Sequence, residues 1–202
     1  SRALKNSIIS IREWQLRDYS SNKYKNVDDK PYGGGAGMVM QVKPIRDCLA
    51  KIKELEPETK VIYLSPQGEP LNQKLVEKLA KFDSLTLLCG RYEGVDERVV
   101  ENNIDYEVSI GDYVISGGEL ASMVLIDAVS RRIDNVLGNK DSLNDSFAVN
   151  LLDHPHYTRP ESIDGESVPE VLLSGNQAKI DAWRREQAIK KTKQKRPDIL
   201  SS

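Results

Sequence analysis

The chain has 202 residues, of which 39% are hydrophobic and 30% are charged, and its net charge is −2 at pH 7. This composition is typical of a soluble globular protein with one domain, or with one domain and a small appendage, and it excludes a disordered or fibrous protein. No apolar run approaches the roughly 18 residues of a membrane-spanning helix, so we expect no membrane segment.

The two cysteines, Cys48 and Cys89, lie 41 residues apart and lack Cys-x-x-Cys spacing. This spacing argues against a disulfide scaffold or a thiolate metal site, and it fits a reducing compartment. The first residues form neither a signal peptide nor a lipidation site. Because the chain does not begin with Met, we expect its numbering to start inside a longer protein. We predict a cytoplasmic protein.

In chain order, the N-terminal segment predicts the start of a helix and then a short strand at residues 7–11. Four glycines among residues 33–37 predict a loop. A helix is expected around residues 49–55. Residues 61–64 then predict a short buried strand, which the Ser-Pro-Gln-Gly turn signature at 65–68 closes.

Helical spacing of apolar residues predicts a helix over residues 71–82, and an apolar run predicts a second short strand at 85–89. Another helix fits residues 96–103, and a third strand fits 106–110. Strands that alternate with helices at this spacing predict an α/β fold with a mainly parallel sheet. Residues 120–129 are apolar on nearly every face, which predicts a helix buried on all sides, either deep in one core or between two subunits.

The chain turns polar after Gly138, so we predict a first domain over residues 1–137, a flexible linker at 138–146 and a more helical second domain over 147–202. Residues 183–196 carry seven Lys or Arg residues and one Glu, a local charge of +6 that leaves −8 for the rest of the chain. Such a stretch could hold nucleic-acid phosphates by counterion release. It could equally be a solvated helix face, and charge alone does not decide.

Glycine-containing loops follow the three predicted strands, at residues 65–68, 90–94 and 109–118. Ligands of open α/β sheets bind at the carboxyl ends of the strands, where loops expose backbone N–H and C=O groups. Glycines let a backbone approach a flat adenine, although they fit simple tight turns equally well. The G-x-G-x-x-G and P-loop patterns are absent, which argues against a dinucleotide-binding Rossmann enzyme and a P-loop nucleotide hydrolase.

Taken together, five segments resemble the motifs of the bacterial tRNA (guanine-N1)-methyltransferase family: PYGGGAGMVM at 31–40, LSPQG at 64–68, LLCGRYEGVDERV at 87–99, SIGDYVISGGELA at 109–121 and DSFAVNLLDHPHYTRPE at 145–161. The resemblance spans nearly the whole chain, in the same order. It implies a SPOUT-type α/β domain with a trefoil knot, a flexible linker, a small helical tRNA-binding C-terminal domain, and a homodimer with its active site at the subunit interface. It also implies a further N-terminal strand upstream of Ser1, which we expect to be missing here.

The resemblance implies S-adenosylmethionine as the methyl donor and, through Glu93, a magnesium requirement. From the sequence alone, Glu93 would be a turn residue. The positions that match the family's cofactor site are Tyr63, Leu64, Ser65, Pro66, Gly90, Tyr92, Glu93, Gly94, Ser109, Ile110, Gly111, Tyr113, Ile115, Gly117 and Gly118. Most of these contacts would be made by the backbone, so bulkier residues at Gly117 or Gly118 are expected to harm binding more than conservative side-chain changes.

Guanine N1 carries a proton at neutral pH, so its methylation needs a general base and a positive or donor group for the charge that moves onto O6. By resemblance, Asp145 is the base, and Arg131 supports the base or the O6 charge. By pattern alone, Asp145 would be a linker carboxylate and Arg131 a solvated cation at a helix C-terminus. The implied substrate is guanosine at tRNA position 37, beside the anticodon, flipped out of its stack.

We expect tRNA contacts from the second domain, namely from His156, Tyr157, Arg159, Arg184, Arg185 and Lys190. His154 and His156 are the only histidines, and two ligands seldom suffice for a metal, so we predict no metal site there and favour a structural or tRNA-contacting role. Two alternative functions stay open. The chain could be a SPOUT methyltransferase with another RNA substrate, or a noncatalytic RNA-binding module whose glycine loops are structural.

Overall fold

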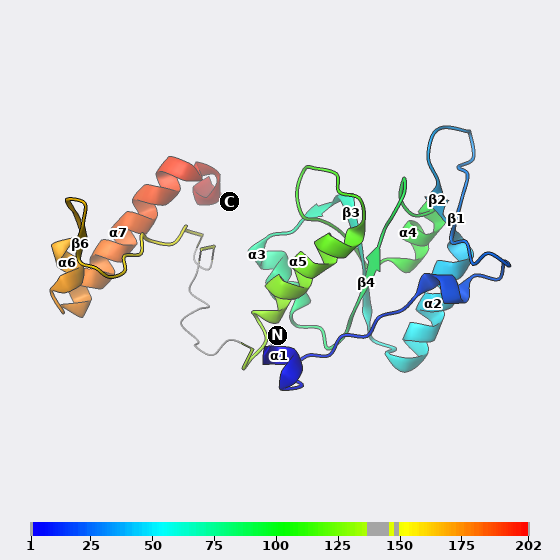
Figure 1. Ribbon diagram of the computed structural model, residues 1–202, viewed down its shortest axis with the longest axis horizontal. Helices are drawn as coiled ribbons and strands as arrows, with labels where there is room; N and C mark the ends of the chain where they lie inside the picture. The colour runs from blue at the N-terminus through cyan, green and yellow to red at the C-terminus, as the bar shows by residue number, and fades with distance from the viewer. Residues whose placement is uncertain (1, 137–145, 148–149, 202) are drawn as a thin grey trace. The chain divides into compact units, whose positions relative to one another are not determined.

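The computed structural model describes residues 2–136, 146–147 and 150–201, and the chain divides into two compact units, Ser1–Gly138 and Asn139–Ser202 (Figure 1). The elements of the first unit are α1 (Arg2–Lys5), η1 (Leu16–Tyr19), β1 (Asp28–Asp29), β2 (Val39–Met40), α2 (Val42–Leu55), β3 (Lys60–Pro70), α3 (Gln73–Leu79), β4 (Leu85–Cys89), α4 (Glu97–Asn103), β5 (Tyr106–Ser109) and α5 (Gly118–Ser130). Those of the second unit are β6 (Ser162–Ile163), β7 (Glu166–Ser167), α6 (Glu170–Leu173), α7 (Gln177–Lys195) and η3 (Pro197–Ser201). Within the described residues, no helix is long and apolar enough to cross a membrane.

The first unit is built on a parallel three-stranded sheet with the strand order β4-β3-β5. Successive side chains of the central strand β3 point to opposite faces of the sheet. Val61 and Tyr63 enter one hydrophobic cluster, whereas Ile62 and Leu64 enter another. Because both faces are covered, the strand reads as a continuous apolar run. The predicted α/β fold with a parallel sheet is confirmed.

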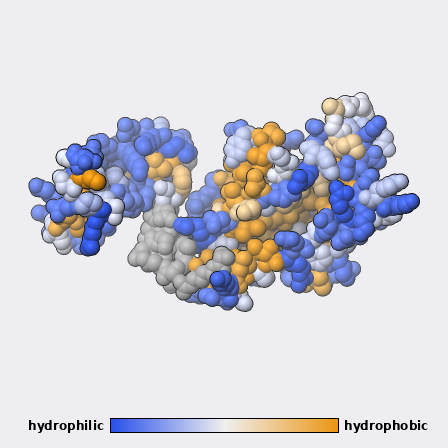
Figure 2. Space-filling model, in the orientation of Figure 1, coloured by the Kyte–Doolittle hydropathy of each residue, from blue (hydrophilic) through white to orange (hydrophobic). Residues whose placement is uncertain are grey.

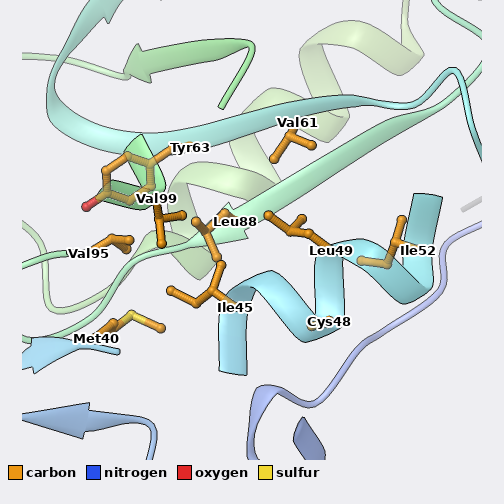
Figure 3. Close-up of a cluster of buried hydrophobic side chains, with 10 residues drawn as sticks. All are labelled: Met40, Ile45, Cys48, Leu49, Ile52, Val61, Tyr63, Leu88, Val95 and Val99. Atoms are coloured by element: carbon orange, nitrogen blue, oxygen red, sulfur yellow. The ribbon is translucent and has the colours of Figure 1, made fainter. Parts of the chain in front are cut away.

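Helices cover both faces of this sheet. Residues of α2 and α4 pack on one face around Leu88 of β4, and residues of α3 and α5 pack on the other face around Val108 of β5 (Figures 1 and 3). Burial of each aliphatic side chain in these clusters contributes roughly 1.5–3 kcal/mol. The two clusters therefore hold the carboxyl ends of the three strands, and the loops that leave them, in fixed positions.

Strand β3 is longer than predicted, because it continues through the Ser-Pro-Gln-Gly segment to Pro70. Leu64 and Glu69 both pair with Val108, so the four residues between them bulge out of the ladder. A Cβ atom on Gly68 would overlap the backbone of β5, which makes glycine necessary at this contact. The prediction that the strand ends at Leu64 is therefore wrong, since the turn residues form a bulge within it.

Residues 7–11 form no strand, so that prediction is also wrong. Ser7 adopts a left-handed φ of 54°, and its N–H donates to the carbonyl of Leu4 at 3.1 Å, which turns the chain directly after α1. The ladder of the three-stranded sheet joins only β3, β4 and β5. The isoleucines at 8, 9 and 11 therefore have no place in it.

Helix α5 is buried on one face only. Leu125 and Val129 pack into the core, whereas Leu120 and Met123 are each 64% exposed and Val124 is 50% exposed. Hydrophobic residues gather on the surface over α5 and the loop before it (Figure 2). The expectation of a helix buried deep in one core is wrong for the single chain, and an exposed apolar face remains.

The second unit consists of α6, α7, η3 and the β6–β7 hairpin. Asp164 and Gly165 form the hairpin turn with φ values of 51° and 85°, the backbone that a two-residue Asp-Gly turn favours. Helix α7 buries Ile180, Ala188 and Thr192. The linker predicted at 138–146 lies outside the described residues, apart from Ser146.

Candidate functional site

The loops that follow β4 and β5 meet through their backbones. The N–H of Gly118 donates to the carbonyl of Gly90 at 2.8 Å. A Cβ atom on Gly118 would lie 2.8 Å from Cα of Cys89 and 2.9 Å from N of Gly90, which is closer than real Cβ contacts. Glycine at position 118 therefore allows helix α5 to start directly against the end of β4.

The side chain of Tyr63 on β3 packs against the loop after β4. Its side chain is 6% exposed, and a Cβ atom on Gly90 would lie 2.8 Å from its ring (Figure 3). A Cβ atom on Gly94 would lie 3.4 Å from its hydroxyl. Burial raises the pKa of Tyr63 above its ordinary value of 10.0, so the phenol is neutral at physiological pH. Both ends of the Gly-Arg-Tyr-Glu-Gly segment thus rest on one uncharged ring.

The loop after β5 is closed by its own hydrogen bonds. The hydroxyl of Ser109 donates to the carbonyl of Gly111 at 3.0 Å and accepts the N–H of Gly111 at 3.1 Å. The hydroxyl of Tyr113 donates to the carbonyl of Ile110 at 3.3 Å, and its ring lies against Gly111, whose φ is 149°. These contacts shape the loop and leave Tyr113 56% exposed.

An open hollow of about 480 Å³ lies beside this loop and the start of α5. This size falls within the range of small-molecule sites. The guanidinium of Arg91 donates to the carboxylate of Glu119 at 2.8 Å, and both residues line the hollow. Of the predicted cofactor-binding residues, Ile115 and Gly117 line it.

The predicted cofactor-binding residues of β3 lie at its bulge. Leu64 and Ser65 are buried, whereas Pro66 is exposed. The hydroxyl of Ser65 accepts the N–H of Gln67 at 3.1 Å, which shapes the bulge.

The chain that follows the glycine-rich segment at 33–37 lies beside the loop after β4. The N–H of Glu93 donates to the carbonyl of Met38, and the N–H of Met40 donates to the carbonyl of Gly94, each at 2.9 Å. A Cβ atom on Gly37 would overlap the Glu93 side chain, which is otherwise exposed. The sequence predicted this loop but not its partner.

Tyr92 lies in the middle of the loop after β4. Its side chain is exposed, and its backbone is left-handed, with a φ of 61°.

The predicted catalytic pair is only partly described. Asp145 lies outside the described residues. Arg131 is half-buried and caps the C-terminus of α5, where its N–H donates to the carbonyl of Asp127 at 3.2 Å. The adjacent Arg132 donates to Glu77 of α3 at 2.6 Å and so ties the two helices together. Arg132 thus has a structural role between the two helices.

The predicted tRNA-contacting residues all belong to the second unit and are exposed, namely His156, Tyr157, Arg159, Arg184, Arg185 and Lys190. The ring centroid of Tyr157 lies 6.4 Å from that of Trp183. This contact places the segment that carries His156, Tyr157 and Arg159 beside α7. Asp153, which sequence reasoning missed, contacts both histidines. Its position directly before His154 was the available signal.

Comparisons with known proteins cover both units. The sequence model of a family described as tRNA (Guanine-1)-methyltransferase TrmD matches residues 1–202. A tRNA (guanine-N(1)-)-methyltransferase from Nitrosospira multiformis is 53% identical over 206 residues, which cover 99% of this chain and 80% of that protein. Proteins of the same name from Vibrio vulnificus and Shewanella sediminis are 53% and 54% identical over 203 residues, which cover 100% of this chain and 82% and 84% of theirs. These matches confirm the resemblance of the five motifs, and the chain belongs to the tRNA (guanine-N1)-methyltransferase family.

Proposed function

We propose that the protein transfers a methyl group from S-adenosylmethionine to N1 of guanosine at tRNA position 37. Membership of the family supports the reaction and the class of substrate. The structural observation that carries the proposal is the backbone contact between Gly90 and Gly118 at the carboxyl ends of the strands. Parallel α/β sheets bind their ligands at this edge.

In the site that we propose, main-chain groups bind the cofactor. When bound, S-adenosylmethionine supplies an electrophilic methyl group on its sulfonium. Gly90 and Gly118 leave no room for side chains, so the N–H and C=O groups of their loops can approach a flat base. The neutral ring of Tyr63 supports the loop after β4 without adding charge to it.

For the chemical step, we assign Asp145 as the base that takes the N1 proton of guanine. Arg131 is assigned to the base or to the negative charge that develops on O6. Its place at the C-terminus of α5 fixes its backbone, and the pairing of Arg132 with Glu77 fixes the same helix end. Positioning of N1 in line with the methyl group contributes the remaining acceleration.

Glu93 offers one exposed carboxylate for the magnesium that we propose the enzyme uses. Within the described residues, Glu93 belongs to no group of three possible metal ligands. Magnesium usually keeps several waters and takes one or two protein carboxylates, so the residue fits as a single ligand.

The tRNA would be held by the second unit. Helix α7 exposes Arg184, Arg185 and Lys190, which suit phosphate contacts. Tyr157 is 50% exposed and offers a face for base stacking, with His156 and Arg159 nearby in the chain. Because tRNA is the substrate, we propose that the protein works in the cytoplasm.

The first domain (1–137) is proposed to carry the SPOUT trefoil knot, and the second (147–202) to bind tRNA as a helical C-terminal domain behind the linker at 138–146. The exposed apolar face of α5 supports a homodimer, since contiguous apolar surface marks interaction sites. In this arrangement the active site lies at the subunit interface, beside the hollow that Leu120 and Gly117 help to line.

Labelled methyl transfer tests this proposal. Transcripts with guanosine or adenosine at position 37 are incubated with labelled S-adenosylmethionine and with the wild type, Asp145→Asn, or the exposed control Asp134→Asn. We expect transfer only to the guanosine transcript, loss of transfer in Asp145→Asn, and normal transfer in the control. Calorimetry should show that Asp145→Asn still binds the cofactor, because a base acts after binding.

Other outcomes have distinct meanings. Transfer to another RNA but not to this transcript would indicate a different SPOUT substrate. Absence of both transfer and cofactor binding in the wild type would favour a noncatalytic RNA-binding module. Cofactor affinity that falls together with activity in Asp145→Asn would contradict the assignment of the base.

A further inference from the structure

A compact cluster of ligand-type side chains lies at the start of the second unit. Asp153, His154 and His156 each offer one ligand atom, and these atoms all lie within 4.8 Å of one another. Nε2 of His156 lies 2.7 Å from Oδ2 of Asp153, and Nδ1 of His154 lies 2.9 Å from Oδ1. The two imidazoles meet edge to face, with centroids 4.5 Å apart.

One atom of this cluster lacks a partner. Nδ1 of His154 is buried and makes no hydrogen bond, although Oδ1 of Asp153 is close. Oδ1 instead accepts the backbone N–H of His154 at 2.8 Å. A buried polar atom without a partner is uncommon in folded proteins and calls for an explanation, such as a missing ion.

The backbone that carries the cluster is anchored to its surroundings. The carbonyl of Asp153 accepts Nζ of Lys191 at 3.0 Å, and the N–H of Asp153 donates to the hydroxyl of Ser146 at 2.9 Å. The N–H of Leu152 donates to the hydroxyl of Thr192 at 2.9 Å, and Thr192 is fully buried in α7. The ligand-bearing segment is therefore fixed to a helix at two points, which favours a preorganised site.

The donor set selects a class of metal. Two imidazoles and one carboxylate are the three protein ligands of open tetrahedral zinc sites. Imidazole suits zinc, copper and nickel, whereas magnesium and calcium prefer oxygen ligands. Ligand atoms roughly 2 Å from zinc lie roughly 3.3 Å apart in a tetrahedron. The three ligand atoms lie within 4.8 Å of one another, so metal binding would draw them closer together.

We propose that Asp153, His154 and His156 bind one divalent transition-metal ion of the zinc class. The fourth position stays open to water or to a ligand. Coordination gives Nδ1 of His154 a partner and replaces the hydrogen bond between Asp153 and His156. The ion braces the segment before Tyr157, and its ligands do not include Glu93, the proposed magnesium ligand.

The test measures metal binding and does not depend on methyl transfer. The full chain without an affinity tag is stripped of metal and titrated with Zn²⁺ against a chromophoric chelator. We expect one Zn²⁺ per chain, with no displacement by excess Mg²⁺. Asp153→Asn, His154→Gln and His156→Gln should each weaken affinity at least about tenfold, the lower range for loss of supporting contacts. Asp164→Asn removes another carboxylate from the same unit and should bind normally.

Two further measurements keep the test decisive. Circular dichroism of the metal-free variants shows whether each one is folded, and only folded variants are compared. Co²⁺ bound to the wild type should give visible ligand-field absorption that His156→Gln lacks. A wild type that does not bind Zn²⁺ would overturn the proposal, and so would binding that all three substitutions leave unchanged.

Discussion

At the scale of single residues, Gly117 and Gly118 are neighbours with different surroundings. A Cβ atom on Gly118 would meet the backbone of Cys89 and Gly90, whereas one on Gly117 would meet the ends of the Glu119 and Arg91 side chains. Backbone atoms of a packed strand cannot move aside, but an exposed carboxylate can rotate away. The sequence treated the two glycines alike, and the structure separates them.

We therefore expect Gly118→Ala to lower the melting temperature and to abolish most S-adenosylmethionine binding. Gly117→Ala should leave the melting temperature nearly unchanged, because its φ of −178° suits any residue. Thermal unfolding and calorimetric titration of both variants measure these effects. Equal losses in both would contradict an explanation based on backbone overlap at position 118.

The two thiols are protected by burial. Burial raises the pKa of Cys48 to about 11, against a smaller opposite effect of its hydrogen bond with Tyr19, and burial also raises the pKa of Cys89, whose sulfur lies 3.1 Å from the Ser122 hydroxyl. The thiolate is the reactive form, so a raised pKa slows alkylation.

At pH 8, iodoacetamide should label Cys48 at least about 100-fold more slowly in the native protein than in denaturant, because its thiolate is scarce and its side chain is 3% exposed. Mass spectrometry of timed samples gives the two rates. Comparable rates in the two conditions would show that α2 opens readily from the sheet.

At the scale of elements, the helix start at α4 combines a cap with an ion pair. The carboxylate of Asp96 accepts the backbone N–H of Arg98 at 3.0 Å and binds its guanidinium at 2.8 and 2.9 Å. The hydrogen bond from Arg98 holds the pKa of Asp96 below its ordinary value of 3.8. A lowered pKa stabilises the fold above the ordinary value, and this contribution disappears as the pH falls through the pKa of the folded state.

Replacement of Asp96 by Ala should lower the free energy of unfolding by about 0.5–2 kcal/mol at pH 7. Asp96→Asn retains a capping oxygen and should lose less. It should also lack the part of the acid destabilisation that Asp96 contributes between pH 5 and pH 2. Denaturant titrations across this range compare the three proteins, and parallel curves for Asn and wild type would exclude the linkage.

The elements also show what local patterns encode. Strand β4 matches its predicted bounds because its leucines pack on both faces of the sheet, and this apolar run is visible in the sequence. The extension of β3 beyond Leu64 depends on the pairing of Glu69 with Val108, 39 residues further along the chain, which no local pattern records. Helix α3 is shorter than predicted at its start. Asn72 caps the helix, and the N–H of Leu71 donates to the carbonyl of Ser109 at the end of β5.

Part of the candidate site could likewise be predicted from the sequence, and part depends on the fold. Motif resemblance identified the glycines at the strand ends, since their spacing along the chain is characteristic. The contact between Gly90 and Gly118, the support from Tyr63 and the approach of Met38 to Glu93 arise from the parallel order of the strands. The Asp153 cluster was missed because the direction of a side chain in an irregular segment cannot be read from its neighbours in sequence.

At the scale of the whole molecule, the exposed apolar face of α5 predicts self-association. We expect the wild type to be a dimer by light scattering. The variant Met123→Lys should be a monomer without methyl transfer, because burial of an unpaired charge in the interface costs free energy. Leu55→Lys changes another exposed residue, at the end of α2, and should stay dimeric. A monomeric wild type would remove the basis for an active site shared between subunits.

Binding of tRNA should depend steeply on salt through α7. Loss of each phosphate contact reduces the slope of log affinity against log salt by roughly 0.7–0.9. The double variant Arg184→Gln with Arg185→Gln should therefore show a shallower slope and weaker binding at low salt. Lys23→Gln removes an exposed cation from the first unit and serves as the control. Identical slopes for wild type and the double variant would exclude this face of α7.

The contact between Gly90 and Gly118 has a consequence for inhibitor resistance. Every substitution at a glycine adds atoms, and at these two positions the added atoms would disturb the protein's own backbone or the ring of Tyr63. A compound whose hydrogen bonds go to main-chain groups of these loops contacts atoms that no point mutation can delete, except a change to proline, which removes an N–H. Resistance to such a compound would then have to arise elsewhere, by export of the drug or by overproduction of its target.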